Sequence, residues 1–343
     1  MLSIFVEYKT PVNMKNSLTF ILVITAVIFF DSCNVDCDCN VDPYADMVTE
    51  YDVKKSIIQV NSINFATGFE TIFEDSYSKI STDSDSSFNA QICQSVIDPV
   101  RFFDDESGYF FVESNNAWMV AHATKPELVG TYRYDVTDVN GKYYVRDMVE
   151  AIVYKGYGFV DYYFAHPETG INTKKLSFIK SIPAADFFLG TGFYTYNPDN
   201  YYTKEESALA IVENVTKSMA EGISGGFNLM ADSLDKVQFS REFIDHIRFF
   251  DNHSGYFFIY DFSCVNVAHG TQKDLQGQNL YNYQDSHGNY VIRGLLDVVE
   301  SSGSGYYEYY WNNPVTGSEE KKLAFVYKIP GIDYFIGSGV YLD

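Results

Sequence analysis

The chain has 343 residues, enough for two domains of roughly 100–200 residues each. Apolar residues make up 46 % and aromatic residues 17 %, so packed cores are feasible and the composition argues against a disordered chain. The formal net charge of −22 at pH 7 repels phosphate backbones and anionic headgroups, which argues against nucleic acid and a peripheral membrane surface as partners.

The N-terminal segment reads as a targeting signal. Residues 18–30, "LTFILVITAVIFF", form an apolar run of 13 residues after Lys15, shorter than the about 20 that span a bilayer. This pattern is typical of a secretory signal peptide, with Met14 as an alternative start. Ser32 followed by Cys33 resembles the cleavage site of a bacterial-type lipoprotein, so we expect a signal over 1–33, lipidation of Cys33 and a tether over 34–43. An uncleaved N-terminal anchor and simple secretion remain open. The expected location is extracytoplasmic and membrane-anchored, at the cell surface or in the periplasm.

Three of the five cysteines, Cys33, Cys37 and Cys39, crowd the segment after the signal. Two thiols in a tether lack the four closed ligands that structural zinc requires. The sequence therefore predicts an acidic spacer there, with no metal.

The rest of the chain repeats itself. "GYFFVESNNAWMVAHA" begins at Gly108 and "GYFFIYDFSCVNVAHG" at Gly255, 147 positions later (255 − 108 = 147). The same offset pairs Arg101 with Arg248, His122 with His269, Arg146 with Arg293, Lys175 with Lys322 and Tyr194 with Tyr341. A gap-free offset over this length predicts a duplicated structural unit. Cys93 and Cys264 do not occupy equivalent positions, so they are not a disulfide shared by both repeats.

Each repeat is expected to open with helices. A three- and four-residue apolar period predicts a helix within 44–80, capped by Asp46 or Thr49, and a second one over about 88–100. In the second repeat, Thr203 and Glu206 predict a capping box. "GISGG", at 222–226, is expected to weaken the end of that helix.

Each repeat then continues as a sheet. In the first copy, strands are expected at "GYFFV", "WMVAHA", "GFVDYYF", "KKLSFIKSI" and "FFLGTGFY", with a helix around 145–153. Helices before and across an antiparallel sheet make an α+β module. With a boundary near "YNPDNYYTK", the predicted modules are 44–200 and 201–343.

Several short blocks in the same order in both copies carry a resemblance. "RFF…GYFF", "AHA/AHG", "YYF/YYW", "KKL" and "GTGFY/GSGVYL" are similar to the Cache domain, in its single-module type-2 form. The resemblance implies two tandem PAS-like extracytoplasmic sensor modules, each an antiparallel sheet of five or six strands with a long N-terminal helix. It also implies a pocket on one sheet face for a small ligand, often a short carboxylate.

Strand alternation suggests where such a ligand binds. Lys175 shares a face with Ser177, and Lys322 with Ala324, which places a cation beside a small side chain. Arg146 and Arg293 are candidate second cations, because a guanidinium can bind both oxygens of a carboxylate. The alternatives are that the lysines are edge-strand charges and that the arginines pair with nearby acids.

Further candidates are aromatic or imidazole groups. Hydroxyls of Tyr162 or Tyr163, and of Tyr309 or Tyr310, can donate hydrogen bonds, while Trp311 offers an apolar wall. His122 and His269 either touch the ligand or tie down the following loop. The second copy is the preferred binder because of Trp311 and of Ala324 beside Lys322.

The sequence shows no G-x-S-x-G, H-E-x-x-H or phosphate-loop motif, so we expect neither an enzyme nor a cofactor. Asp343 ends the sequence directly after the last predicted strand. The predicted function is therefore a sensor-type protein for a small organic anion, without its own output domain, that reports to a membrane receptor, kinase or transporter. The alternative is a structural or adhesive surface lipoprotein that keeps the fold without binding a ligand.

Overall fold

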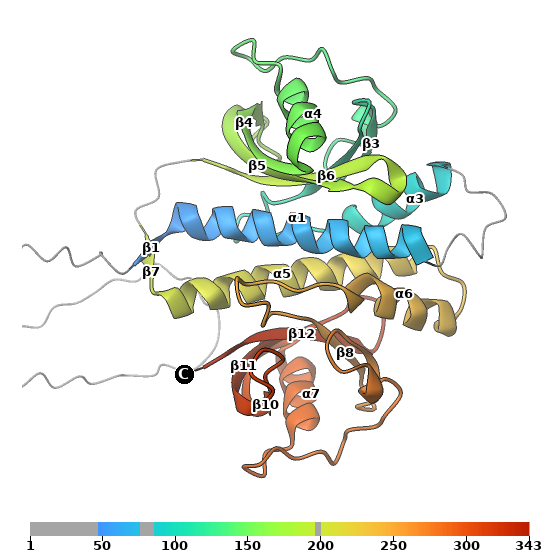
Figure 1. Cartoon of the computed structure of the whole chain (residues 1–343), viewed down its shortest axis with the longest axis vertical. Helices are drawn as coiled ribbons and strands as arrows, with labels where there is room; N and C mark the ends of the chain where they lie inside the picture. Colours follow the sequence, from blue (N-terminus) through green and yellow to red (C-terminus); the bar gives the residue numbers. More distant parts are fainter. Residues whose placement is uncertain (1–46, 76–85, 196–199, 343) are drawn as a thin grey trace, which may run out of the picture. The chain divides into compact units, whose positions relative to one another are not determined.

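The computed structural model describes residues 47–75, 86–195 and 200–342. The predicted signal, Cys33 and the tether lie outside these residues, and so does the 18–30 apolar run. Within the described ranges, no helix combines the length and the apolar character needed to cross a membrane. The described residues belong to one compact unit (Figure 1).

Two long helices begin at the predicted caps. α1 (Glu50–Asp75) starts after Thr49, whose Oγ1 accepts a hydrogen bond from the backbone N–H of Asp52 at 3.2 Å. α5 (Lys204–Phe227) starts with the capping box of Thr203 and Glu206. The shorter helices are α3 (Ser86–Ile97), α4 (Tyr144–Lys155), α6 (Ser233–Asp245) and α7 (Val291–Ser302), and short 3-10 turns lie at η1 (Pro126–Leu128), η2 (Pro183–Ala185) and η3 (Lys273–Leu275).

Two five-stranded antiparallel sheets follow the same strand order, which confirms the predicted α+β fold of two modules. The first has the order β3-β2-β6-β5-β4 and the second β9-β8-β12-β11-β10. The first-sheet strands are β2 (Phe110–Ser114), β3 (Met119–His122), β4 (Tyr157–Ala165), β5 (Asn172–Ile182) and β6 (Phe187–Tyr194). Those of the second are β8 (Phe258–Asp261), β9 (Asn266–His269), β10 (Ser304–Asn312), β11 (Glu319–Lys328) and β12 (Tyr334–Tyr341).

The strand register repeats as well. Lys175 pairs with Tyr194 across β5 and β6, and Lys322 pairs with Tyr341 across β11 and β12. An unpredicted two-stranded pairing joins β1 (Val48–Thr49) to β7 (Tyr201–Tyr202), just before α1 and α5 begin. The module boundaries at 200 and 201 remain a prediction, because 196–199 lie outside the described residues.

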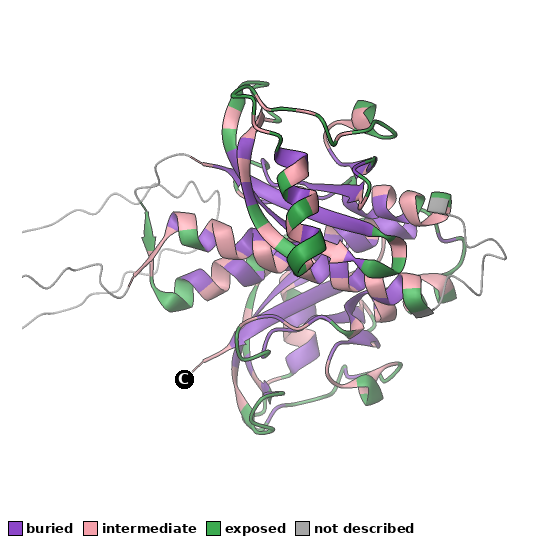
Figure 2. Cartoon of the chain, turned by 45° about the horizontal axis from the view of Figure 1, so that its top comes forward, coloured by how far each residue is buried: buried purple, intermediate pink, exposed green. Residues whose placement is uncertain are grey.

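Each sheet is covered on both faces. α1 packs on β5 and β6, while α4 lies on the other face of that sheet; α5 and α7 do the same for the second sheet (Figure 1). The expected alternation holds, since Leu176 and Phe178 of β5 join the core around α1 and Ile179 joins the core under α4. One continuous apolar core runs from the first sheet through α1 and α5 to the second, and Figure 2 shows these elements largely buried.

The "GISGG" segment lies in the last turns of α5, and it is helical. The helix continues through it to Phe227, because its glycines allow close packing with neighbouring helices. A Cβ on Gly222 would lie 2.7 Å from the Phe65 ring of α1, and one on Gly226 would lie 2.4 Å from the Phe239 ring of α6. Gly222 thus allows α5 to approach α1 of the other module, and Gly226 allows it to approach α6 of its own module.

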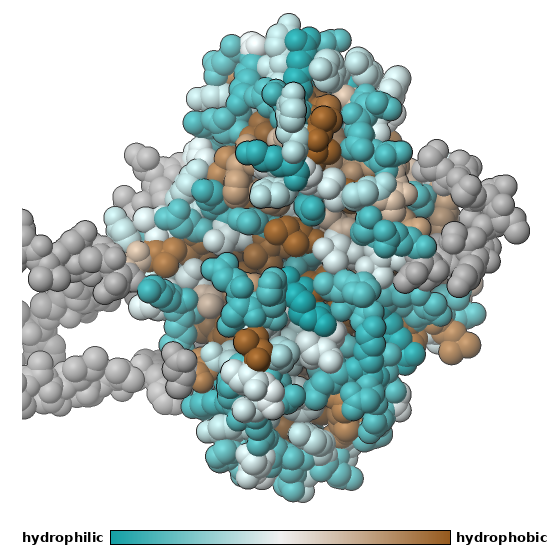
Figure 3. Space-filling view, in the orientation of Figure 1, coloured by the Kyte–Doolittle hydropathy of each residue, from teal (hydrophilic) through white to brown (hydrophobic). Residues whose placement is uncertain are grey.

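The outer surface is mostly hydrophilic, as the net charge of −22 requires. In Figure 3, hydrophobic side chains on the visible face gather mainly along the line of α1.

Candidate ligand-binding cavities

Each module has a small cavity between its sheet and the helix on the face opposite the long helix. The first lies under α4 and is lined by Tyr109, Phe111, Glu113, Met119, His122, Arg133, Tyr144, Met148, Tyr162 and Phe164. The second lies under α7 and is lined by Phe258, Tyr260, His269, Val291, Ile292, Leu295, Tyr309 and Trp311. The two sets overlap under the 147-residue offset, so duplication produced two versions of one cavity.

A buried, unpaired lysine stands beside each cavity. Lys175 and Lys322 have no exposed surface, and neither Nζ has a hydrogen-bond partner among the described residues. Lys175 Nζ lies 3.7 Å from the centroid of the Tyr109 ring and 5.8 Å from that of Phe164, two residues of the first cavity's wall. Burial lowers the pKa of both lysines to about 7. An ammonium in this position lacks the counter-charge that burial normally requires.

Tyrosine hydroxyls surround the first lysine. The Tyr109 and Tyr194 hydroxyls lie 3.2 Å apart, and the Tyr162 hydroxyl lies 3.1 Å from Ser177 Oγ. Burial raises the pKa of Tyr109 and of Tyr162, so both stay protonated and can donate hydrogen bonds.

The second module keeps the first of these pairs and loses the other. The hydroxyls of Tyr256 and Tyr341 also lie 3.2 Å apart. Tyr309, the counterpart of Tyr162, has no serine to meet because Ala324 replaces Ser177.

The two repeated histidines are neutral donors. His122 Nδ1 accepts a hydrogen bond from the backbone N–H of Lys125 at 3.0 Å, and His269 Nδ1 accepts one from Gln272 at 3.1 Å. The remaining ring proton is therefore on Nε2. Burial, reinforced by the nearby lysine, lowers the pKa of each histidine to about 3. Both roles predicted for the histidines are thus compatible, since Nδ1 orders the loop while the ring lines the cavity.

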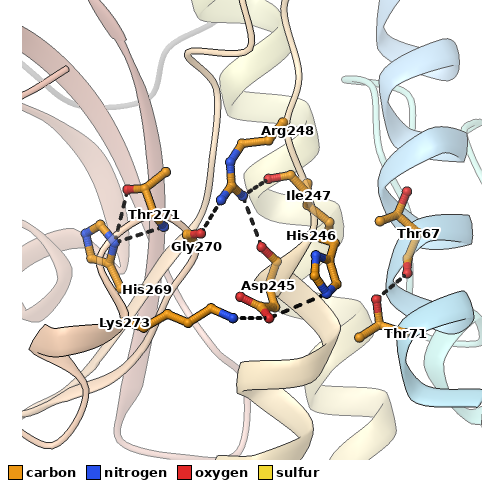
Figure 4. A network of polar contacts seen from close by, with 10 residues as sticks. All are labelled: Thr67, Thr71, Asp245, His246, Ile247, Arg248, His269, Gly270, Thr271 and Lys273. Carbon is orange, nitrogen blue, oxygen red and sulfur yellow. Dashed lines mark hydrogen bonds and ion pairs between the residues drawn. The ribbon is translucent and has the colours of Figure 1, made fainter. Parts of the chain in front are cut away.

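The arginines of the repeated "RFF" hold the histidine loops in place. Arg248 donates to the carbonyl of Gly270, directly after His269, and to the Ile247 carbonyl at 2.6 Å, which links this loop to the end of α6 (Figure 4). Arg101 donates to the Ala123 carbonyl at 2.7 Å in the same way. Sequence reasoning assigned these arginines no role, although their identical spacing from the histidines was a usable signal.

Arg146 and Arg293 line neither cavity. Arg146 pairs with Asp135 at 2.6 Å and stacks on Tyr143, with its guanidinium carbon 3.8 Å from the ring centroid. Arg293 stacks on Tyr290 at 3.2 Å and borders an open surface hollow beside α7. The structure therefore does not bring the two candidate second cations to the lysines.

The first cavity has a polar end that sequence reasoning missed. Arg133 Nη2 donates to the Tyr144 hydroxyl at 2.7 Å, and Glu113 lines the same wall with 2 % of its surface exposed. Burial raises the pKa of Glu113 to about 7, against the attraction of Arg133. At the 147-residue offset the second module has Tyr260, Leu280 and Val291 instead. This difference between two otherwise similar repeats was the feature of the sequence that could have indicated the polar end.

The second cavity is more completely filled. It leaves about 0 Å³ for a water-sized molecule, against about 10 Å³ in the first, so both cavities are nearly closed. Trp311, predicted as an apolar wall, is 5 % exposed and donates from Nε1 to Gln272 Oε1 at 2.9 Å. The tryptophan thus occupies the position that Phe164 takes in the first module.

The chain has two PAS-like modules, each with a buried cation beside a cavity. This arrangement places it among ligand-binding sensor domains. The family comparison agrees with this class. The Cache domain family matches residues 45–223 and 236–343, so the chain belongs to the Cache domain family.

Two curated relatives are signalling proteins. The chain is 37 % identical over 89 residues to the sensor histidine kinase MctS of Rhizobium johnstonii, covering 26 % of this chain and 19 % of that one. It is 23 % identical over 147 residues to the methyl-accepting chemotaxis protein McpP of Pseudomonas putida, covering 42 % and 26 %. The matches thus span about a fifth to a quarter of these relatives' length.

Two solved structures are similar to parts of the chain. A methyl-accepting chemotaxis protein of Vibrio parahaemolyticus is 30 % identical, with a TM-score of 0.31, over 33 % of this chain and 75 % of that one. A Cache chemosensory domain, described as recognising carboxylic acid, is 23 % identical, with a TM-score of 0.37, over 43 % and 95 %.

Proposed function

We propose that the protein is an extracytoplasmic sensor that binds a small organic anion, such as a short carboxylate, in the cavity of its first module. The observation that carries this proposal is the buried Lys175 ammonium, which has no partner among the described residues. A ligand carboxylate supplies the missing counter-charge, and the interaction is strong because the site excludes water.

Neutral donors around the lysine suit the same ligand. The hydroxyls of Tyr109 and Tyr162 and the Nε2–H of His122 belong to the same cavity wall. They add hydrogen bonds to a carboxylate without adding charge. One cation with several neutral donors fits a small monoanion better than a phosphate, which carries more charge.

The first module is the proposed binder, which reverses the preference drawn from the sequence. Its cavity is larger, and its wall carries more polar groups. Trp311, which favoured the second copy in the sequence, fills space there. We assign Lys322, His269 and Tyr309 to a related but smaller site.

The sensor role accords with the sensor histidine kinase among the relatives. Anchoring through Cys33 and signal transfer to a membrane receptor, kinase or transporter are part of this proposal. Arg101 and Arg248 provide a route, because each also bonds to a helix. The Arg101 backbone N–H donates to Glu221 of α5, and the Arg248 side chain donates to the Asp245 carbonyl at the end of α6.

A thermal-shift screen of the purified protein against short carboxylates and amino acids tests the proposal. Ligand at 100 times its dissociation constant stabilises the protein by about 2.7 kcal/mol. At least one carboxylate is expected to raise the melting temperature with a saturating dependence on concentration. If none does, the adhesive or structural alternative is favoured.

A further inference from the structure

The polar end of the first cavity has unsatisfied hydrogen-bonding atoms of its own. Glu113 Oε2 and Arg133 Nε are both buried without a partner among the described residues. No ion pair within 4.0 Å joins Glu113 to Arg133 in that part of the chain, although both line the cavity. A buried carboxyl oxygen without a donor is costly unless a ligand supplies one.

This polar end is distinct from the lysine end. Tyr109, directly before β2, and Phe111 and Glu113 on β2 all line the cavity, and the Lys175 ammonium lies against the Tyr109 ring. Glu113 therefore stands four residues further along the strand, which corresponds to about 13 Å at the usual rise per residue. A ligand that reaches both ends presents a different group to each.

The other polar residues of this wall are paired with each other. Arg133 holds the Tyr144 hydroxyl at 2.7 Å, and the Tyr144 ring stacks on Tyr162 with centroids 4.4 Å apart. The arginine stays close enough to oppose the pKa increase that burial causes at Glu113. Arg133 thus donates to Tyr144 and not to Glu113, which leaves Glu113 Oε2 in the cavity wall without a donor.

We infer that Glu113, in the cavity wall that it shares with Arg133 and Tyr144, forms a second subsite that accepts a hydrogen bond from a hydroxyl or ammonium group of the ligand. The preferred ligand of the first module is then a hydroxy acid or an amino acid, rather than a plain fatty acid. This inference rests on the proposed carboxylate site at Lys175. The second module, with Tyr260 in place of Glu113, lacks the subsite.

The test uses matched straight-chain acids of two to six carbons that carry a hydrogen, hydroxyl or ammonium group on the far carbon. Their affinities are measured by calorimetry with the full chain. For at least one chain length, the wild type is expected to bind the hydroxy or amino acid at least tenfold more tightly than the plain acid. In Glu113→Leu that preference should disappear while the plain acid still binds.

Glu113→Gln distinguishes a hydroxyl from an ammonium group as the ligand's hydrogen-bond donor. The amide keeps an acceptor oxygen but no charge, so hydroxyl preference should survive within about threefold and ammonium preference should be lost. Tyr260→Phe, the matched change in the second module, should leave all affinities unchanged. Equal melting temperatures of the unliganded variants exclude misfolding.

Failure of the subsite and failure of the proposed function give different results. Plain acids that bind the wild type as tightly as their hydroxy and amino counterparts at every length overturn the subsite and leave the Lys175 site standing. The same holds if the preference survives in both Glu113 variants. If no acid of any kind binds the wild type, the proposed function fails and the subsite falls with it.

Discussion

Lys175 Nζ lies 3.7 Å from the centroid of the Tyr109 ring, inside a fully buried shell where the ring face is its main electrostatic partner. A cation–π contact stabilises a desolvated cation by about 2 kcal/mol, which is less than the cost of burying an unpaired ammonium. The second module repeats this relationship, with Lys322 Nζ at 4.0 Å from Tyr256. Both modules therefore carry a destabilising buried cation beside the cavity.

Replacing either lysine by an apolar isostere should stabilise the unliganded protein. Burial lowers the pKa of Lys322 from 10.5 to about 7, and each unit corresponds to about 1.4 kcal/mol. Lys322→Met should therefore raise the free energy of unfolding at pH 7 by roughly 2–5 kcal/mol in urea titrations. Lys321→Met, at the neighbouring half-exposed position, should change it by no more than about 0.5 kcal/mol. A loss of stability in Lys322→Met would contradict the description of an unpaired buried charge.

The lysines also predict how stability depends on alkaline pH. Their pKa is about 7 in the folded state against 10.5 for the ordinary value, so between these pH values the unfolded state binds more protons. Stability should then rise with pH from about 7 to 9.5, by up to about 1.4 kcal/mol per unit for each lysine. Unfolding free energies at pH 7, 8 and 9 measure the slope, which should flatten in the Lys175→Met, Lys322→Met double variant.

The histidines predict how the free energy of unfolding changes at acid pH. Burial lowers the pKa of His122 and His269 to about 3, below the ordinary 6.5. Their contribution to stability is complete above pH 6.5 and is lost as pH falls toward 3, by about 1.4 kcal/mol per unit for each ring. Between pH 6.5 and 4.5, His122→Gln should lose less stability than the wild type. Equal losses would show that His122 takes up protons as readily in the folded state as in the unfolded state.

The close helix packing within the second module is testable at Gly226. Helix propensity alone predicts that Gly226→Ala stabilises α5 by up to about 1 kcal/mol. The structure predicts the reverse, since the new Cβ would lie 2.4 Å from the Phe239 ring of α6. Thermal unfolding should show a loss of about 1–3 kcal/mol, the usual cost of overpacking a core. A gain would mean that the helices are not in close contact there.

The repeat and strand alternation made much of this architecture predictable. A gap-free offset fixed the equivalence of His122 with His269, and the alternation of Lys175 and Leu176 assigned each to its sheet face. The capping box of Thr203 was readable because its residues are neighbours in sequence. These features depend on local spacing.

The features that escaped prediction depend on tertiary contacts. Arg133 lies in the long connection before α4. No periodicity there indicates which way a side chain points, so the hydrogen bond from Arg133 to Tyr144 could not be predicted from the sequence. Arg146 had the right chemistry but lies on the outer side of its helix. The β1–β7 pairing involves two residues from each segment, too few to form a strand pattern.

The most direct measurement is the calorimetric affinity of a short carboxylate for the wild type, Lys175→Met and Lys322→Met. A buried charge pair that loses one partner loses about 2–5 kcal/mol, which is a factor of about 30 to several thousand. Lys175→Met should lose affinity by at least about 30-fold, while Lys322→Met stays within about threefold of the wild type. Unchanged affinity in Lys175→Met, or a loss confined to Lys322→Met, would contradict the assignment of the ligand to the first module.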